Sequence, residues 1–330
     1  MRLTPKFALL FALVGLVPLL LLGGLAFWQS QRALIANAEG HVLSVSVLKE
    51  DELLQWMDGN LTILESVAAR PLVIELIESL VTTQRGTAEW TALREDLLTN
   101  HLMPNLTSRG LLDYHILHPE TGQVLVATER KNEGKFRESE DFLVEGRLQT
   151  YIGRVEYHVA AERLVMHAAT PIATGDGTLA AVLSAHVNLE EMGRILQLSS
   201  GMHETEDTYA INDFSFFVTE PLFGEGYALR RTLQTYGANA ALRGEAGVTT
   251  YDDYRGRPVI GAYRWIEALN IGLLVEVDAQ EVTAPVAALR RSMIILGAVV
   301  ALLVVISSTG LARSLVRPIR RLLAGTQSLG

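Results

Sequence analysis

The sequence predicts an α+β protein with two antiparallel-sheet modules in tandem on a long N-terminal helix, flanked by two transmembrane helices. Three observations support this prediction. Apolar residues recur at three- and four-residue spacing from residue 29 to about residue 100, as in a helix, and alternate from Leu111 onward, as in strands. The strand pattern occurs twice in succession. Two uncharged apolar runs lie on either side of these modules.

The apolar runs cover residues 7–28 and 293–312. A helix of about 20 residues is about 30 Å long, which matches the hydrocarbon core of a bilayer. We therefore expect two transmembrane helices in contact with the lipid bilayer. The first run could instead be a cleaved signal peptide, but it is longer than a typical signal core and no A-x-A-like site follows it. An uncleaved anchor is favoured, and Trp28 suits its interface with water.

Charge is divided sharply along the chain. All 37 acidic residues lie between Glu39 and Glu281. Six of the 28 basic residues lie outside residues 29–292, which gives this central region a net charge of −15. Short basic flanks mark the cytoplasmic side of a membrane. We therefore expect residues 1–6 and the C-terminal end in the cytoplasm, with the central region outside it. The chain has no cysteine, so that region must be stabilised by its core. No nucleic-acid partner is expected.

Residues 29–110 are predicted to form a stalk helix and a helical lead-in. The first apolar stripe of the stalk consists of Leu34, Ala38, Val42 and Val45. Pro71 marks either a break or the first turn of a new helix. Another helical piece is expected at residues 89–98.

Residues 111–199 are predicted to form the first sheet module. Its expected strands cover residues 114–118, 123–128, 157–160, 164–172 and 179–187. Residues 133–150 between them are expected to be helix or loop. Asn188 suits the N-cap of the helix that follows the last strand.

Residues 200–292 are predicted to form the second sheet module and an exit helix. Its expected strands cover residues 208–211, 216–219, 248–251, 258–265 and 271–277, with a short helix at 233–242. Residues 187–191 (VNLEE) and 277–281 (VDAQE) lie at matching points of the two modules, 90 residues apart. The helix that begins at Ala279 continues into the second apolar run.

A family resemblance is carried by residues 251–266 (YDDYRGRPVIGAYRWI) and 272–278 (GLLVEVD). With them, residues 29–292 resemble the double-Cache sensor domains of bacterial transmembrane receptors. The resemblance implies two PAS-like modules, with residues 111–199 as the membrane-distal Cache module and residues 200–292 as the membrane-proximal one. It also implies a two-pass protein of the bacterial inner membrane whose central domain is periplasmic.

The tail at residues 313–330 begins with RSLVRPIRRL and resembles the start of a HAMP domain, truncated at residue 330. A generic basic stop-transfer tail is the alternative. HAMP helices pair between two protomers, so the resemblance implies a homodimer. It further implies an output domain outside this chain: a histidine kinase, a diguanylate cyclase or a chemotaxis signalling domain. The frequency of each type in the family favours a histidine kinase.

The sequence lacks G-x-S-x-G, H-E-x-x-H and a phosphate-binding glycine loop. We therefore expect no enzymatic activity from this chain and no cofactor. The leading hypothesis is a sensor that binds a small extracytoplasmic ligand and signals through its second transmembrane helix. A membrane-tethered binding or assembly protein without an output domain is the alternative. An anchored extracytoplasmic enzyme is a third option that no motif supports.

Six of the eight histidines lie within residues 101–186. Four of them fall on predicted strands: His115, His158, His167 and His186. Two or three of them could converge on a metal ion or an anionic ligand. Histidines scattered over strands nevertheless have no metal-binding spacing. Roles at the surface or in a hydrogen-bonded core are therefore favoured, and no metal site is predicted.

The resemblance also implies a ligand pocket in the distal module, between its sheet and residues 133–150. The candidate ligand-binding residues are Phe136, Arg137, Phe142, Tyr151, Tyr157, His167 and His186. Amino-acid-sensing members of the family place carboxylates against the ligand ammonium, where this chain has Val159 and His186, and they carry an Arg-x-Trp pair that is missing here. We therefore predict that the small-molecule ligand is not an ordinary α-amino acid. An organic anion paired with Arg137 and a histidine is the alternative.

Overall fold

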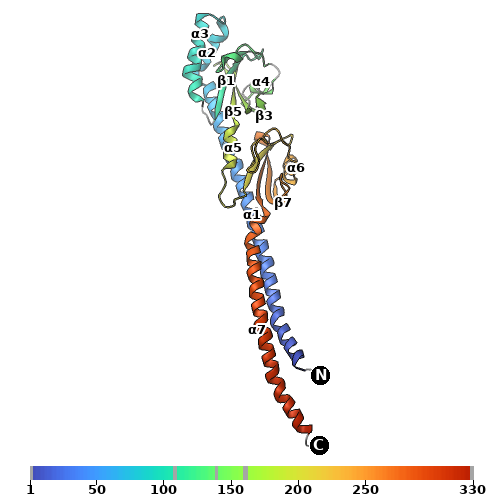
Figure 1. The fold of residues 1–330 in the computed structure, drawn as a ribbon. Helices are drawn as coiled ribbons and strands as arrows, with labels where there is room; N and C mark the ends of the chain where they lie inside the picture. The colour runs from blue at the N-terminus through green and yellow to red at the C-terminus, as the bar shows by residue number, and fades with distance from the viewer. Residues whose placement is uncertain (1–2, 107–109, 138–139, 159–162, 328–330) are drawn as a thin grey trace. The chain divides into compact units, whose positions relative to one another are not determined.

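The computed structural model describes residues 3–106, 110–137, 140–158 and 163–327. The chain divides into two compact units (Figure 1). One comprises His41–Val277 and contains both sheets. The other comprises Met1–Gly40 together with Asp278–Gly330. This α+β architecture, with a long N-terminal helix and two antiparallel sheets, confirms the predicted fold class.

Three helices precede the first sheet: α1 (Leu3–Ala68), α2 (Pro71–Thr82) and α3 (Ala88–Asp96). Pro71 occupies the first turn of α2, where its missing N–H is tolerated, so it begins a helix. The Thr87 side chain caps α3 by accepting a hydrogen bond from the Trp90 N–H. A π-helical turn (Leu97–Leu102) and a 3₁₀ turn (Met103–Asn105) then lead toward the first strand.

The first sheet has the strand order β2-β1-β5-β4-β3 and is antiparallel at its paired strands. Its strands are β1 (Leu111–Leu117), β2 (Val124–Ala127), β3 (Tyr151–His158), β4 (Arg163–Ala173) and β5 (Leu179–Asn188). The predicted start of β3 at residue 157 was wrong by six residues. A break in its pairing between Ile152 and Val155 interrupts the alternation that would have revealed the strand. The predicted end of this strand at residue 160 lies outside the described residues.

The two faces of this sheet pack against different helices. On one face, residues such as Tyr114, Ile116 and Met166 join a core formed with α1, α2 and α3. On the other face, Leu117, Ala169 and Val182 pack with Phe142 and Leu143 of the short helix α4 (Asp141–Gly146). A Cβ atom on Gly146 would lie 2.6 Å from the Ala169 Cβ, so a glycine is needed for α4 to approach β4 this closely.

Helix α5 (Leu189–Gln197) follows β5 directly. The Asn188 side chain accepts a hydrogen bond from the Glu190 N–H, so Asn188 is the predicted N-cap. Ninety residues later, at the end of the second sheet, the chain again passes from a strand into a helix, which confirms the predicted repeat.

The second sheet has the order β6-β9-β8-β7, formed by β6 (Asp207–Asn212), β7 (Gly247–Asp252), β8 (Pro258–Ile266) and β9 (Ile271–Asp278). The strand predicted at residues 216–219 is wrong. Phe216 and Phe217 form only isolated bridges, because the backbone bonds of residues 215–218 are divided between residues 210–212 and residues 229–233. Helix α6 (Tyr236–Leu242) begins after its cap Thr235, later than predicted.

Helix α7 (Ala279–Gln327) starts where β9 ends. Within the described residues, two helical stretches are long and apolar enough to cross a membrane: one in Leu13–Ala68 and one in Ala279–Ser307. Each of them contains most of one predicted apolar run. These are candidate spans by length and composition.

Candidate ligand site in the first sheet

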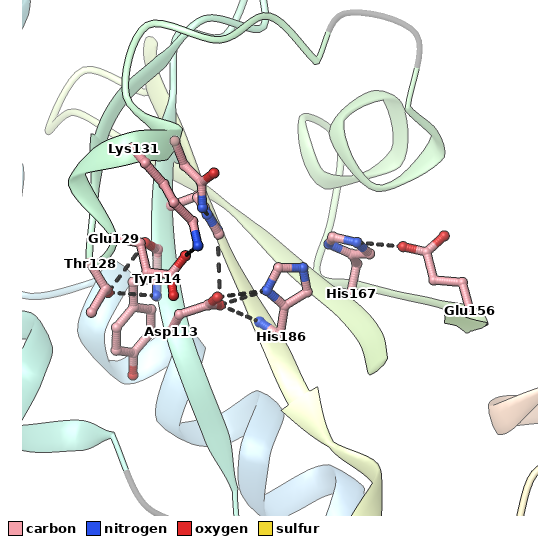
Figure 2. A network of polar contacts seen from close by, with 10 residues as sticks. Asp113, Tyr114, Thr128, Glu129, Lys131, Glu156, His167 and His186 are labelled. Carbon is pink, nitrogen blue, oxygen red and sulfur yellow. Dashed lines mark hydrogen bonds and ion pairs between the residues drawn. The ribbon is translucent and has the colours of Figure 1, made fainter. Parts of the chain in front are cut away.

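A row of polar side chains crosses three neighbouring strands on the α4 side of the first sheet. Asp113 on β1 lies opposite His186 on β5, and His186 lies opposite His167 on β4. His115 follows Asp113 by two residues and therefore projects from the same face. Figure 2 shows Asp113 directed at His186, with His167 beyond it.

A bulge in β1 places Asp113 in this row. The pairing of β1 with β5 shifts between Leu111 and Asp113, so that Leu111 joins the helix-side core while Asp113 faces α4. Residues two apart in a regular strand would share a face. The extra residue, Leu112, reverses that relation, as bulges commonly do where a side chain must be redirected.

Asp113 is tightly bonded to His186. The Nδ1 atom of His186 lies 2.7 and 2.8 Å from the two carboxylate oxygens of Asp113, and the His186 backbone N–H donates to the same carboxylate over 3.1 Å. His115 Nδ1 is 3.9 Å from Asp113 Oδ1. The side chains of Asp113, His115, His167 and His186 are between 7% and 16% exposed, so the cluster is nearly buried yet touches solvent.

Burial and charge act in opposite directions on this cluster. Burial raises the pKa of Asp113, but its hydrogen bond to His186 and the nearby histidine charges outweigh burial and bring that pKa to about 2. For His115, burial is the largest effect and lowers the pKa to about 4, although Asp113 acts to raise it. At pH 7 the site therefore presents a carboxylate beside a neutral His115.

His167 connects the row to α4. Its ring stacks on Phe142 with ring centres 4.5 Å apart and planes inclined by 5°, and its Nε2 lies 2.6 Å from Glu156 Oε1 on β3. The ring centres of His167 and His186 are 4.3 Å apart. Within the described part of the chain, His167 Nδ1 is buried without a hydrogen-bond partner. The site thus combines an aromatic wall with several imidazole groups.

The structure brings three of the seven predicted residues together: Phe142, His167 and His186. Tyr151 packs against the small core that contains Phe142. Arg137 forms an ion pair with Glu140 over 2.7 Å, and its charge also acts on His115. Phe136 and Tyr157 lie apart from the cluster, with 64% and 49% of their surfaces exposed.

Two members of the cluster were missed as site residues. Asp113 was not considered, and His115 was noted only as a strand histidine. Their spacing of two residues on one strand places them on one face and could have revealed them. The comparison of Val159 and His186 with the carboxylates of other sensors did not consider β1, which places Asp113 beside His186. Val159, the other position compared, lies outside the described residues.

No family model matches the sequence, and no curated protein matches it. Solved structures do match. The periplasmic sensory domain of the Campylobacter jejuni chemoreceptor Tlp1 aligns with a TM-score of 0.55 and 14% identity, over 76% of this chain and 99% of that domain. This chain has the fold of a periplasmic sensory domain. The sequence resemblance to such domains is therefore confirmed at the level of fold.

Two further structures share this sensory-domain fold. The sensor domain of the Vibrio cholerae histidine kinase DctB matches with a TM-score of 0.52 and 10% identity, over 76% of this chain and 98% of that domain. The ligand-binding domain of the Pseudomonas fluorescens chemoreceptor CtaA, solved with L-isoleucine, matches with a TM-score of 0.50 and 10% identity, over 77% and 98%. The same fold therefore serves both a chemoreceptor and a kinase.

Proposed function

We propose that this chain is the sensor region of a bacterial transmembrane receptor and that a small extracytoplasmic ligand binds on the α4 side of the first sheet. The observation that carries the proposal is the nearly buried cluster of Asp113, His115, His167 and His186 beside Phe142. Polar groups that converge next to an aromatic wall are typical of small-molecule sites. The shared fold with periplasmic sensory domains supports the same conclusion.

The signal is proposed to leave through α7. This helix starts at Ala279, directly after the last residue of β9, and continues into the second candidate span. A change in the second sheet would therefore have a direct covalent route to the membrane. Residues 313–330 would begin a HAMP domain, two chains would form a homodimer, and a histidine kinase would be the output. A ligand can drive this path only if it binds two receptor states with different affinities.

Ordinary α-amino acids are proposed not to be the main ligands. Both carboxylate oxygens of Asp113 already lie within 2.8 Å of His186 Nδ1, so this carboxylate is engaged before an ammonium group arrives. An organic anion is proposed instead. The histidine rings would donate hydrogen bonds to it, and Arg137 would exchange its ion pair with Glu140 for the anion.

A thermal-shift screen on the complete chain in detergent tests this proposal. The panel contains organic acids, amines and the free amino acids. We expect an organic acid to raise the unfolding midpoint, since a ligand at 100 times its Kd stabilises by about 2.7 kcal/mol. His186→Gln should abolish the shift and His101→Gln should retain it. A screen in which free amino acids give the largest shift would refute the ligand class, and no shift from any compound would refute the site.

A further inference from the structure

The row of side chains in the first sheet contains a set of metal-ligand atoms. Asp113, His115 and His186 each offer one such atom, and these three atoms all lie within 4.8 Å of one another. They come from two adjacent hydrogen-bonded strands, β1 and β5, whose register holds them in place. The proposed function assigns a small ligand to this face of the sheet but names no metal.

We propose that Asp113, His115 and His186 bind a divalent transition-metal ion, with zinc as the reference case. This inference rests on the proposed function, because it places the ion in the ligand site on the α4 side of the first sheet. Two imidazoles and one carboxylate are ligands that suit Zn²⁺, Co²⁺ and Ni²⁺. Mg²⁺ and Ca²⁺ prefer sites made of oxygen atoms, so this set selects against them.

The distances between the ligand atoms are such that small side-chain movements would allow them to bind one ion. Bonds of about 2.0–2.1 Å in a tetrahedral site place two ligand atoms about 3.3 Å apart. The distance from Asp113 Oδ1 to His186 Nδ1 is 2.7 Å and that to His115 Nδ1 is 3.9 Å, so the two values lie on either side of the required spacing. A bound ion would replace the hydrogen-bond contact between Asp113 and His186.

Neighbouring groups lie against two of the three ligands, His115 and Asp113. The Asn132 amide lies next to His115, with its Nδ2 atom 3.3 Å from His115 Nε2. Rotation of this amide would present Oδ1, which accepts the Nε2–H of a His115 that binds the ion through Nδ1. The His186 backbone N–H holds the Asp113 carboxylate over 3.1 Å. Contacts of this kind fix ring and carboxylate orientation around metal ions. Three protein ligands leave a further position for water or for an anionic ligand.

Metal binding can be measured on the complete chain, purified through a tag that contains no histidine and stripped with EDTA. We expect about one equivalent of Zn²⁺ to be retained after dialysis, and bound Co²⁺ to give the visible absorption of a low-symmetry site. Asp113→Asn and His186→Gln should each weaken metal affinity by more than about tenfold. His101→Gln makes the same chemical change outside the cluster and should leave affinity unchanged.

Circular dichroism identifies any variant that fails to fold, and His115→Gln then serves as the second test of the ligand set. The inference is overturned if the wild-type chain retains no stoichiometric metal, or if the cluster variants bind it as tightly as His101→Gln does. The thermal-shift screen, repeated on EDTA-treated and Zn²⁺-loaded chain, separates the two proposals. Organic acids that stabilise the metal-free chain would support the ligand site while refuting a metal requirement for it.

Discussion

Glu276 on β9 shows how a single residue can set the pH response of the second sheet. Its side chain is 1% exposed, and burial raises its pKa to about 8, although Tyr209 and Tyr251 act to lower it. Neither carboxyl oxygen meets the geometry of a hydrogen bond with any described residue. Glu276 is therefore protonated at pH 7, since the charged form would be buried without adequate compensation.

We predict that the chain loses stability as pH rises from 5 to 8 and that Glu276→Gln removes most of this loss. The folded state holds a proton on Glu276 over a range in which the unfolded state has released it, so unfolding becomes easier as pH rises through the folded pKa of about 8. The slope from this one group approaches about 1.4 kcal/mol per pH unit. Unfolding midpoints measured across this pH range test it, with exposed Glu225→Gln as the control.

At the scale of elements, close approach between α6 and β8 depends on glycine. A Cβ atom on Gly237 of α6 or on Gly261 of β8 would collide with the hydroxyl group of Tyr251. The Tyr251 side chain is 8% exposed and belongs to the core of the second module, so it has little room to move. The two glycines therefore let the helix and the strand enclose one tyrosine.

Gly261→Ala should destabilise the second module by about 1–3 kcal/mol, because an added methyl group in a filled core forces neighbouring groups to shift. Gly59→Ala is the matched control. Gly59 lies within α1 with no atom near its missing Cβ, so the same substitution should be neutral or stabilising by up to about 1 kcal/mol. Thermal unfolding of both variants compares them. Equal midpoints would contradict the packing argument.

At the scale of the whole molecule, two features bear on topology. All acidic residues lie in the central region, and the flanks of the candidate spans are basic. From the charge pattern and the candidate spans we propose that the two sheets lie on one side of the membrane and both termini on the other. Because the chain has no cysteine, each introduced thiol reports only its own position.

We predict that a membrane-impermeant maleimide labels Gln84→Cys in spheroplasts, in which the cytoplasmic membrane is still intact. Gln84 is exposed in the turn after α2 and lies between the spans. Ser328→Cys, at the C-terminal end, should react only after the membrane has been permeabilised. Labelling of both positions in intact spheroplasts, or of neither, would contradict the two-pass topology.

The sequence by itself determined the fold class, the candidate spans and most strands, because periodicity and apolar length are local properties. It also identified Asn188 as a cap and Pro71 as a helix boundary. Only the tertiary structure decided that Asp113, His186 and His167 form one row. Their alignment depends on the register of three strands that are separated in sequence and on the bulge at Leu112. No local sequence pattern predicts either of these features. The start of β3 was also not predicted from the sequence, because its irregular pairing with β4 interrupts the alternation of apolar residues.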